Sequence, residues 1–174
     1  MTEAQKKRTV VTVLSDDGLA LLSTKSARVA FTVLGDGNLC LDRATDELIE
    51  DLKRFVIANK GLGMSAIQLG IAKRIFVMRQ KSGEIVTIIN PVITEQDADV
   101  VMNVEGCFSI PLPPGVGVNV ARSTKISVQY DTETGEHVST QLVGMEARIF
   151  QHELDHLEGN LMIDKDKFCN WGSF

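Results

Sequence analysis

The sequence has few cysteines and no long apolar run, and each shortage excludes a class of protein. Its three cysteines, Cys40, Cys107 and Cys169, are an odd number without a C-x-x-C pair. We therefore expect no disulfide framework and a reducing, cytoplasmic compartment. No apolar run approaches the roughly 18 residues of a membrane span, and residues 1–14 lack the pattern of a signal peptide. A membrane partner is not expected.

Positive charge is also in short supply. Lys and Arg number 18 against 23 Asp and Glu, a net charge of −5, so the chain offers no basic surface to neutralise a row of phosphates. Direct nucleic-acid binding is not expected. With 174 residues and 44% hydrophobic content, the chain is long enough to bury one core. We predict a single, monomeric domain over residues 1–174, with residues 1–8 as a flexible tail.

The order of strand and helix patterns favours an α+β fold with antiparallel or mixed sheets over a doubly wound sheet. β-Branched or alternating runs predict strands over residues 9–14, 29–34, 74–78, 85–93 (broken at Asn90–Pro91), 100–104, 125–130 and 137–142. The last two have the spacing of a hairpin. We further predict turns at residues 15–18 and 35–38, a glycine-rich loop at 61–70, a proline- and glycine-rich connection before residue 125, and an irregular tail at 170–174.

Two helices are predicted. The first covers about residues 45–60, with Thr45 as its N-cap, an apolar face that includes Leu48 and Leu52, and Gly61 after its end. The second carries the H-E-L-D-H motif at residues 152–156 and is followed by Gly159, a suitable residue beyond a helix C-cap. We expect the sheets to pack around this second, central helix.

The H-E-x-x-H pattern predicts a metal site. Residues i and i+4 of a helix stand on one face, so His152 and His156, two of only three histidines in the chain, can reach the same cation. Glu153 then lies beside the ion, at the position of a general base for a metal-bound water.

The third protein ligand is less obvious from spacing. A catalytic zinc-type site has three protein ligands and one open position. Glu158 points to roughly the opposite side of the helix, and His137 falls in an apparent surface hairpin. Asp164 or Asp166 would complete a metallopeptidase-like site, whereas Cys107 would supply a thiolate from a strand end. Both alternatives remain open on spacing alone.

Three segments together resemble the motifs of the peptide deformylase family. They are residues 61–68 (G-L-G-M-S-A-I-Q), 105–109 (E-G-C-F-S) and 151–156 (Q-H-E-L-D-H), in the order of the family, and the resemblance extends from about residue 45 to 163. It implies a hydrolase of protein biosynthesis that removes the formyl group from the N-terminal formylmethionine of new polypeptides. The alternatives are an H-E-x-x-H metallopeptidase and a non-catalytic metal-binding relative.

The resemblance also implies a metal and a set of catalytic groups. Cys107, His152 and His156 would hold one divalent ion, with Fe(II) as the native ion and Zn(II), Ni(II) or Co(II) as replacements. Glu153 would act as general acid and base. The Gln68 side-chain amide and the Phe108 backbone N–H would stabilise the oxyanion.

Further residues are implied to bind or support an N-formylmethionyl peptide. The backbone would contact the peptide at Leu62, Gly63 and Gly106, and the methionine pocket would be walled by Phe108, Met145 and Ile149. Glu105 would pair with Arg122 to hold the Cys107 loop, and Asp155 would orient a ligand. The resemblance leaves open a transient contact with the ribosome. Ser65 departs from the family, which usually has Ala there.

Overall fold

The computed structural model describes residues 8–164 and 168–173. Its elements, in chain order, are α1 (Asp16–Leu22), β1 (Thr32–Val33), β2 (Leu39–Cys40), α2 (Arg43–Ala58), β3 (Gly63–Ser65), a 3₁₀ turn η1 (Ala66–Leu69), β4 (Ile75–Arg79), β5 (Ile85–Gln96), β6 (Val100–Glu105), β7 (Val116–Ser123), β8 (Lys125–Asp131), β9 (His137–Val143), α3 (Gly144–Leu157) and β10 (Phe168–Ser173). No helix in these ranges is long and apolar enough to cross a membrane.

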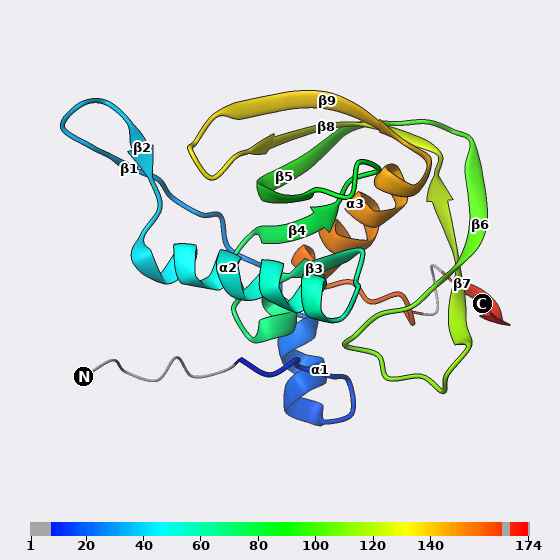
Figure 1. Ribbon diagram of the computed structural model, residues 1–174. Coiled ribbons are helices and arrows are strands. Elements are labelled where there is room, and N and C mark those ends of the chain that lie inside the picture. Colours follow the sequence, from blue (N-terminus) through cyan, green and yellow to red (C-terminus); the bar gives the residue numbers. More distant parts are fainter. Residues whose placement is uncertain (1–7, 165–167, 174) are drawn as a thin grey trace.

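The strands form three sheets, and neighbouring strands are antiparallel. The largest has the order β3-β4-β5-β8-β9, a second has the order β10-β7-β6, and β1 pairs with β2. Helix α3 contacts β3, β4, β8 and β9 of the first sheet and β7 of the second, so it lies where the two sheets meet (Figure 1). The predicted α+β class with antiparallel sheets is confirmed.

Helix α2 covers the five-stranded sheet beside β3 and β4 (Figure 1). Its repeating apolar positions, which include Leu48, Leu52 and Val56, are buried against the sheet. The N-cap is Asp42, not Thr45 as predicted, because the Asp42 carboxylate accepts both the Thr45 backbone N–H (2.7 Å) and the Thr45 hydroxyl (2.9 Å). Thr45, which is buried, is the third residue of the helix and lies inside its first turn.

Helix α3 is fixed to the five-stranded sheet by aromatic packing. The rings of Phe150 and Phe76, both fully buried, meet edge to face with centroids 5.2 Å apart. Ala147, Ile149 and Leu157 extend this contact along the helix. Gly159, with φ of +76°, follows the C-cap residue Glu158 as predicted.

The N-terminal predictions are wrong in two places. Residues 9–14 form no strand, because their amides bond singly to two different loops: Val11 N–H to Gln68 O (2.8 Å) and Val13 N–H to Ser109 O (2.9 Å). Residues 15–18 begin helix α1, since the Ser15 side chain accepts the Gly18 N–H and caps the helix. The predicted tail at 1–8 lies outside the described residues except for Arg8, whose Nε lies 3.0 Å from Asp51 Oδ2.

Pairing between distant segments explains the other differences between the predicted and the observed secondary structure. The predicted loop 61–70 contains strand β3 and the turn η1, and the connection before residue 125 contains β7. Strand β5 continues through Asn90, whose positive φ of +53° accompanies a shift in register. The tail forms β10 against β7, and of residues 29–34 only Thr32–Val33 is strand. The hairpin β8–β9 is confirmed.

Candidate metal centre

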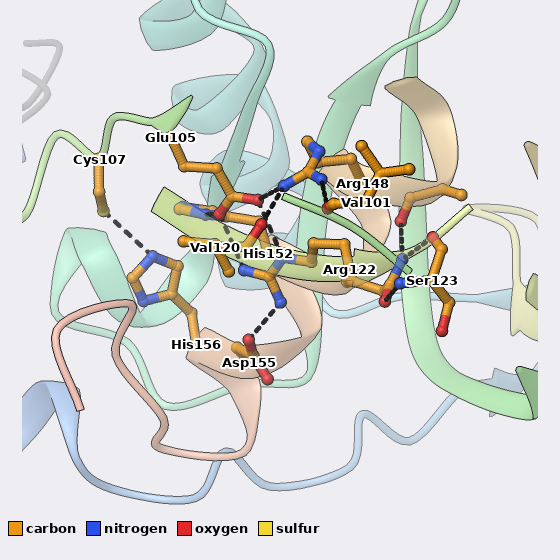
Figure 2. A network of polar contacts seen from close by, with 12 residues as sticks. Val101, Glu105, Cys107, Val120, Arg122, Ser123, Arg148, His152, Asp155 and His156 are labelled. Atoms are coloured by element: carbon orange, nitrogen blue, oxygen red, sulfur yellow. Dashed lines mark hydrogen bonds and ion pairs between the residues drawn. The ribbon is translucent and has the colours of Figure 1, made fainter. Parts of the chain in front are cut away.

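The candidate metal centre assembles three side chains from two segments. His152 and His156 stand one turn apart on α3 with ring centroids 5.0 Å apart, and Cys107 follows the end of β6. The ligand atoms of the three residues all lie within 4.8 Å of one another, and Cys107 Sγ lies 3.2 Å from His156 Nε2 (Figure 2). This is the one group of possible metal ligands within residues 8–164; it excludes His137 and Asp164, and Asp166 lies outside the described residues.

The three residues fit a divalent transition metal. A tetrahedral ion with bonds of about 2.0–2.3 Å separates its ligand atoms by about 3.3–3.8 Å, close to the spacing found here. One thiolate and two imidazoles suit Fe(II), Zn(II), Co(II) or Ni(II). The donor set therefore matches the predicted cofactor class without selecting one ion.

The protein itself favours the thiolate form of Cys107. Burial alone would raise the pKa of the thiol, but the neighbouring His156 and His152 outweigh it and hold that pKa well below its ordinary value. A metal binds the thiolate and not the thiol, so the protein favours the metal-binding form of Cys107 even without a metal ion.

Glu105 orients His152 from behind. Its Oε2 lies 2.8 Å from His152 Nδ1, which leaves Nε2 of the ring for the ligand group. Arg122 binds both carboxylate oxygens, at 3.0 and 2.9 Å, and Arg148 Nη1 donates to Oε1 at 2.6 Å (Figure 2). Burial opposes ionisation of Glu105, but His152 and Arg122 hold its pKa well below the ordinary value. Arg122 also donates to Asp155 (2.5 Å), so the Asp155 carboxylate supports the arginine that holds Glu105.

Arg148 was missed by the sequence analysis. It precedes His152 by four residues on α3, and both side chains reach Glu105. Arg148 also donates to Val120 O (3.1 Å) and Val101 O (2.6 Å), which joins α3 to β6 and β7. The i,i+4 spacing to a ligand histidine was the available signal, but its meaning depends on a carboxylate from another element.

We expect Arg148→Met to lower the free energy of unfolding by about 3 kcal/mol, because it removes one partner of a buried ion pair and leaves two carbonyls short of a donor. Urea denaturation with a chelator present measures this without metal linkage. The control is Arg43→Met, whose side chain is 93% exposed in its pair with Glu47 and should cost less than about 1 kcal/mol. Equal losses in the two variants would contradict the structural role of Arg148.

Gln68 presents its amide nitrogen to the centre. Its Oε1 accepts the Ser65 backbone N–H at 2.9 Å, which fixes the orientation of the amide. Its Nε2 then lies 3.2 Å from Ser109 Oγ and 3.4 Å from Cys107 Sγ. A donor group is thus aimed at the place where the three ligand atoms converge. Ser65 and Ser109, both fully buried, were not predicted as site residues.

Glu153 is buried beside the three ligands. Burial raises the pKa of its carboxyl above the ordinary value, while His152, His156 and the Ser65 hydroxyl act in the opposite direction. A carboxyl with a raised pKa can both accept and return a proton near neutral pH. Its Oε2 lies 2.5 Å from Ser65 Oγ.

A cavity of about 740 Å³ opens over these groups. Its walls include Cys107, His152, Gln68 and Glu153 together with every residue predicted to contact substrate: Leu62, Gly63, Gly106, Phe108, Met145 and Ile149. Leu62 and Met145 are half exposed at the cavity, and the Phe108 ring stands edge-on to Phe55 with centroids 5.0 Å apart. Such a cavity, apolar with a few convergent polar groups, is typical of a site for a small molecule or chain end.

Comparison with known proteins gives a consistent result. The sequence model described as polypeptide deformylase matches residues 16–170. Peptide deformylase of Thermotoga maritima is 40% identical over 125 residues, which are 72% of this chain and 71% of that protein. The Halothermothrix orenii peptide deformylase is 36% identical over 126 residues, 72% of this chain and 79% of that protein.

Solved structures agree with the sequence comparison. The crystal structure of the Thermotoga maritima peptide deformylase superimposes with a TM-score of 0.76 at 32% identity, covering 95% of this chain and all of that one (100%). The Met-Ala-Ser-bound class I type b peptide deformylase of Acinetobacter baumannii gives a TM-score of 0.76 at 27% identity, covering 92% of this chain and 98% of that one.

Proposed function

Since the chain belongs to the polypeptide deformylase family, we propose that it hydrolyses the N-formyl group from the formylmethionine that begins newly made polypeptides. The observation that carries this proposal is the convergence of Cys107, His152 and His156 beside Glu153 in one cavity. A thiolate from the segment after β6 distinguishes the arrangement from a metallopeptidase that would use Asp164.

Cys107, His152 and His156 would hold one divalent ion, with Glu105 and Arg122 keeping His152 in place. When bound, the ion would supply Lewis-acid chemistry, which makes water a stronger acid and polarises a carbonyl group. The Cys107 thiolate would offset part of the positive charge of the ion. The buried Glu105 carboxylate would stabilise the His152 imidazole.

Glu153 would move the proton. Its carboxylate takes a proton from the attacking water and later delivers it to the departing amine, so that formate and a free methionine amine are released. The raised pKa and the position next to both histidines support this assignment. The bond broken is the amide between the formyl carbon and the methionine nitrogen.

Gln68 and Phe108 would stabilise the oxyanion. The Gln68 amide nitrogen already faces the centre because Ser65 holds its oxygen. Phe108 follows Cys107 directly and lines the same cavity, which supports the proposed role of its backbone N–H at the oxyanion. Each preorganised donor is typically worth about 2.7–4 kcal/mol in the transition state.

The same cavity would bind the peptide. Leu62, Gly63 and Gly106 line it and would offer backbone groups to an extended chain, while Phe108, Met145 and Ile149 would offer an apolar pocket for the methionine side chain. Strand β3, which carries Gly63, is an edge strand of the five-stranded sheet. A peptide could add to that edge in the manner of another strand.

The decisive assay uses formyl-Met-Ala-Ser with Fe(II)-loaded protein purified without oxygen, because Fe(II) and a thiolate are both oxidisable. We expect stoichiometric formate and Met-Ala-Ser. Release of free methionine or cleavage of unformylated Met-Ala-Ser would favour the metallopeptidase alternative. Binding of the ion without any turnover would favour the non-catalytic relative.

Gly63→Ala tests the space around Glu153. A Cβ at this position would lie 2.5 Å from Glu153 Oε1, so the carboxylate would have to move. We expect deformylation to fall by at least about tenfold, the order of effect expected when a proton-transfer group is misplaced, with metal content unchanged. Gly35→Ala is the control, since a Cβ added there would meet nothing within 4 Å; wild-type rates in both variants would contradict the prediction.

We also propose that residues 1–174 act as one catalytic domain. Fe(II) as the native ion and a transient ribosome contact remain predictions from the family resemblance, and a monomeric state and a cytoplasmic location remain predictions from the sequence.

A further inference from the structure

Ser65 touches the proposed proton carrier directly. Its hydroxyl oxygen lies 2.5 Å from Glu153 Oε2 and 3.2 Å from the backbone oxygen of Glu153. Both residues are buried, with Ser65 at 0% and Glu153 at 4% exposure. A hydroxyl and a carboxylate at this separation form a charge-assisted hydrogen bond, the stronger kind in proteins, and water does not compete for it here.

Strand β3 lies against one side of the Glu153 carboxylate. Residues two apart in a strand face the same way, so Gly63 and Ser65 both face Glu153 while Met64 points into the core. Gly63 leaves room for Oε1, because a Cβ there would lie 2.5 Å from that oxygen. Ser65 binds the other oxygen, Oε2.

The same residue holds Gln68. The Ser65 backbone N–H donates to Gln68 Oε1, while the Ser65 hydroxyl is directed to Glu153. One strand residue therefore orients both the proposed proton carrier and the proposed oxyanion donor. A side-chain substitution at residue 65 removes the contact to Glu153 and the capping contact of the hydroxyl with the Gln68 backbone N–H. It keeps the bond from the Ser65 backbone N–H to Gln68 Oε1.

We propose that Ser65 is a positioning residue for Glu153. Its hydroxyl donates a hydrogen bond to Oε2 and keeps the carboxylate in one orientation. The other oxygen, Oε1, lies over Gly63 and is the oxygen that exchanges the proton. The inference rests on the proposed function.

The test is Ser65→Ala in the Fe(II)-loaded protein, measured on formyl-Met-Ala-Ser. We expect kcat to fall by about tenfold, because a restraint on the reacting group acts in the transition state, with KM within about twofold and metal content unchanged. The control is Ser26→Ala, which removes a buried hydroxyl that has no hydrogen-bond partner and should leave kcat unaltered. In a Glu153→Gln background, Ser65→Ala should change the residual rate by less than about twofold.

The remaining outcomes separate this inference from the proposed function. Unchanged kcat in Ser65→Ala, or a loss proportional to lost metal, would overturn the positioning role. A crystal structure of the metal-loaded Ser65→Ala protein decides it without activity: we expect the Glu153 carboxylate to rotate or occupy more than one orientation, and an unchanged single orientation would refute the proposal. A wild-type protein inactive on the formyl peptide would overturn the proposed function and leave the crystallographic result to decide the role of Ser65.

Discussion

Replacing Glu153 with Gln should lower kcat for deformylation by about 10²–10⁴-fold, the usual contribution of a positioned acid–base group. The amide preserves the size of the side chain but cannot accept the proton of the attacking water. The proposed ligands Cys107, His152 and His156 are untouched, so metal content, measured by atomic absorption, should equal that of the wild type.

The matched control is Glu158→Gln, the same chemical change on the residue that caps α3. Glu158 pairs with Lys25 (2.6 Å) and Arg74 (2.6 Å), away from the cavity. Its loss should affect stability slightly and leave kcat within about twofold. If Glu153→Gln kept more than a tenth of the wild-type rate, Glu153 would not be the proton carrier.

Cys107→Ala should weaken metal binding by at least about a hundredfold, which corresponds to about 2.7 kcal/mol, and should abolish turnover at ordinary metal concentrations. The thiolate is the only anionic member of the ligand group, so its removal leaves two neutral imidazoles. With Co(II) in place of the native ion, the absorption band from thiolate to metal should disappear.

Cys40→Ala controls for the loss of a half-buried cysteine elsewhere in the chain. It should keep both the metal and the absorption band. Full metal occupancy in Cys107→Ala would instead support a third ligand downstream of α3, as in the metallopeptidase alternative.

The part of the site that is local in sequence could be predicted from sequence. His152, Glu153 and His156 lie on one helical turn, and helix periodicity alone places them together. Cys107 was assigned to the same metal site only through the family resemblance, because no spacing rule connects the end of β6 with α3. The hairpin β8–β9 was predictable for the same local reason, since its strands are adjacent in the chain.

What could not be predicted depends on pairing between distant segments. Strand β7 is stabilised by β6 on one side and β10 on the other, and neither partner is visible in the composition of residues 116–123. From the sequence alone, Arg148 is an ordinary cation on a helix, because its partner Glu105 lies on β6 and is brought close only by the fold. From the sequence alone, Ser65 is a serine in a predicted loop. Its hydroxyl faces Glu153 on α3 only because β3 pairs with β4.

The amides of Val11 and Val13, which bond to Gln68 O and Ser109 O, have a consequence for the order of assembly. During synthesis these N-terminal residues leave the ribosome long before either acceptor does. They can dock only after the segments that carry Gln68 and Ser109 have formed, so the entropy cost of closing a long stretch of chain opposes their docking. Val11 and Val13, which are made before both of their acceptors, are therefore expected to be among the last residues to dock during folding.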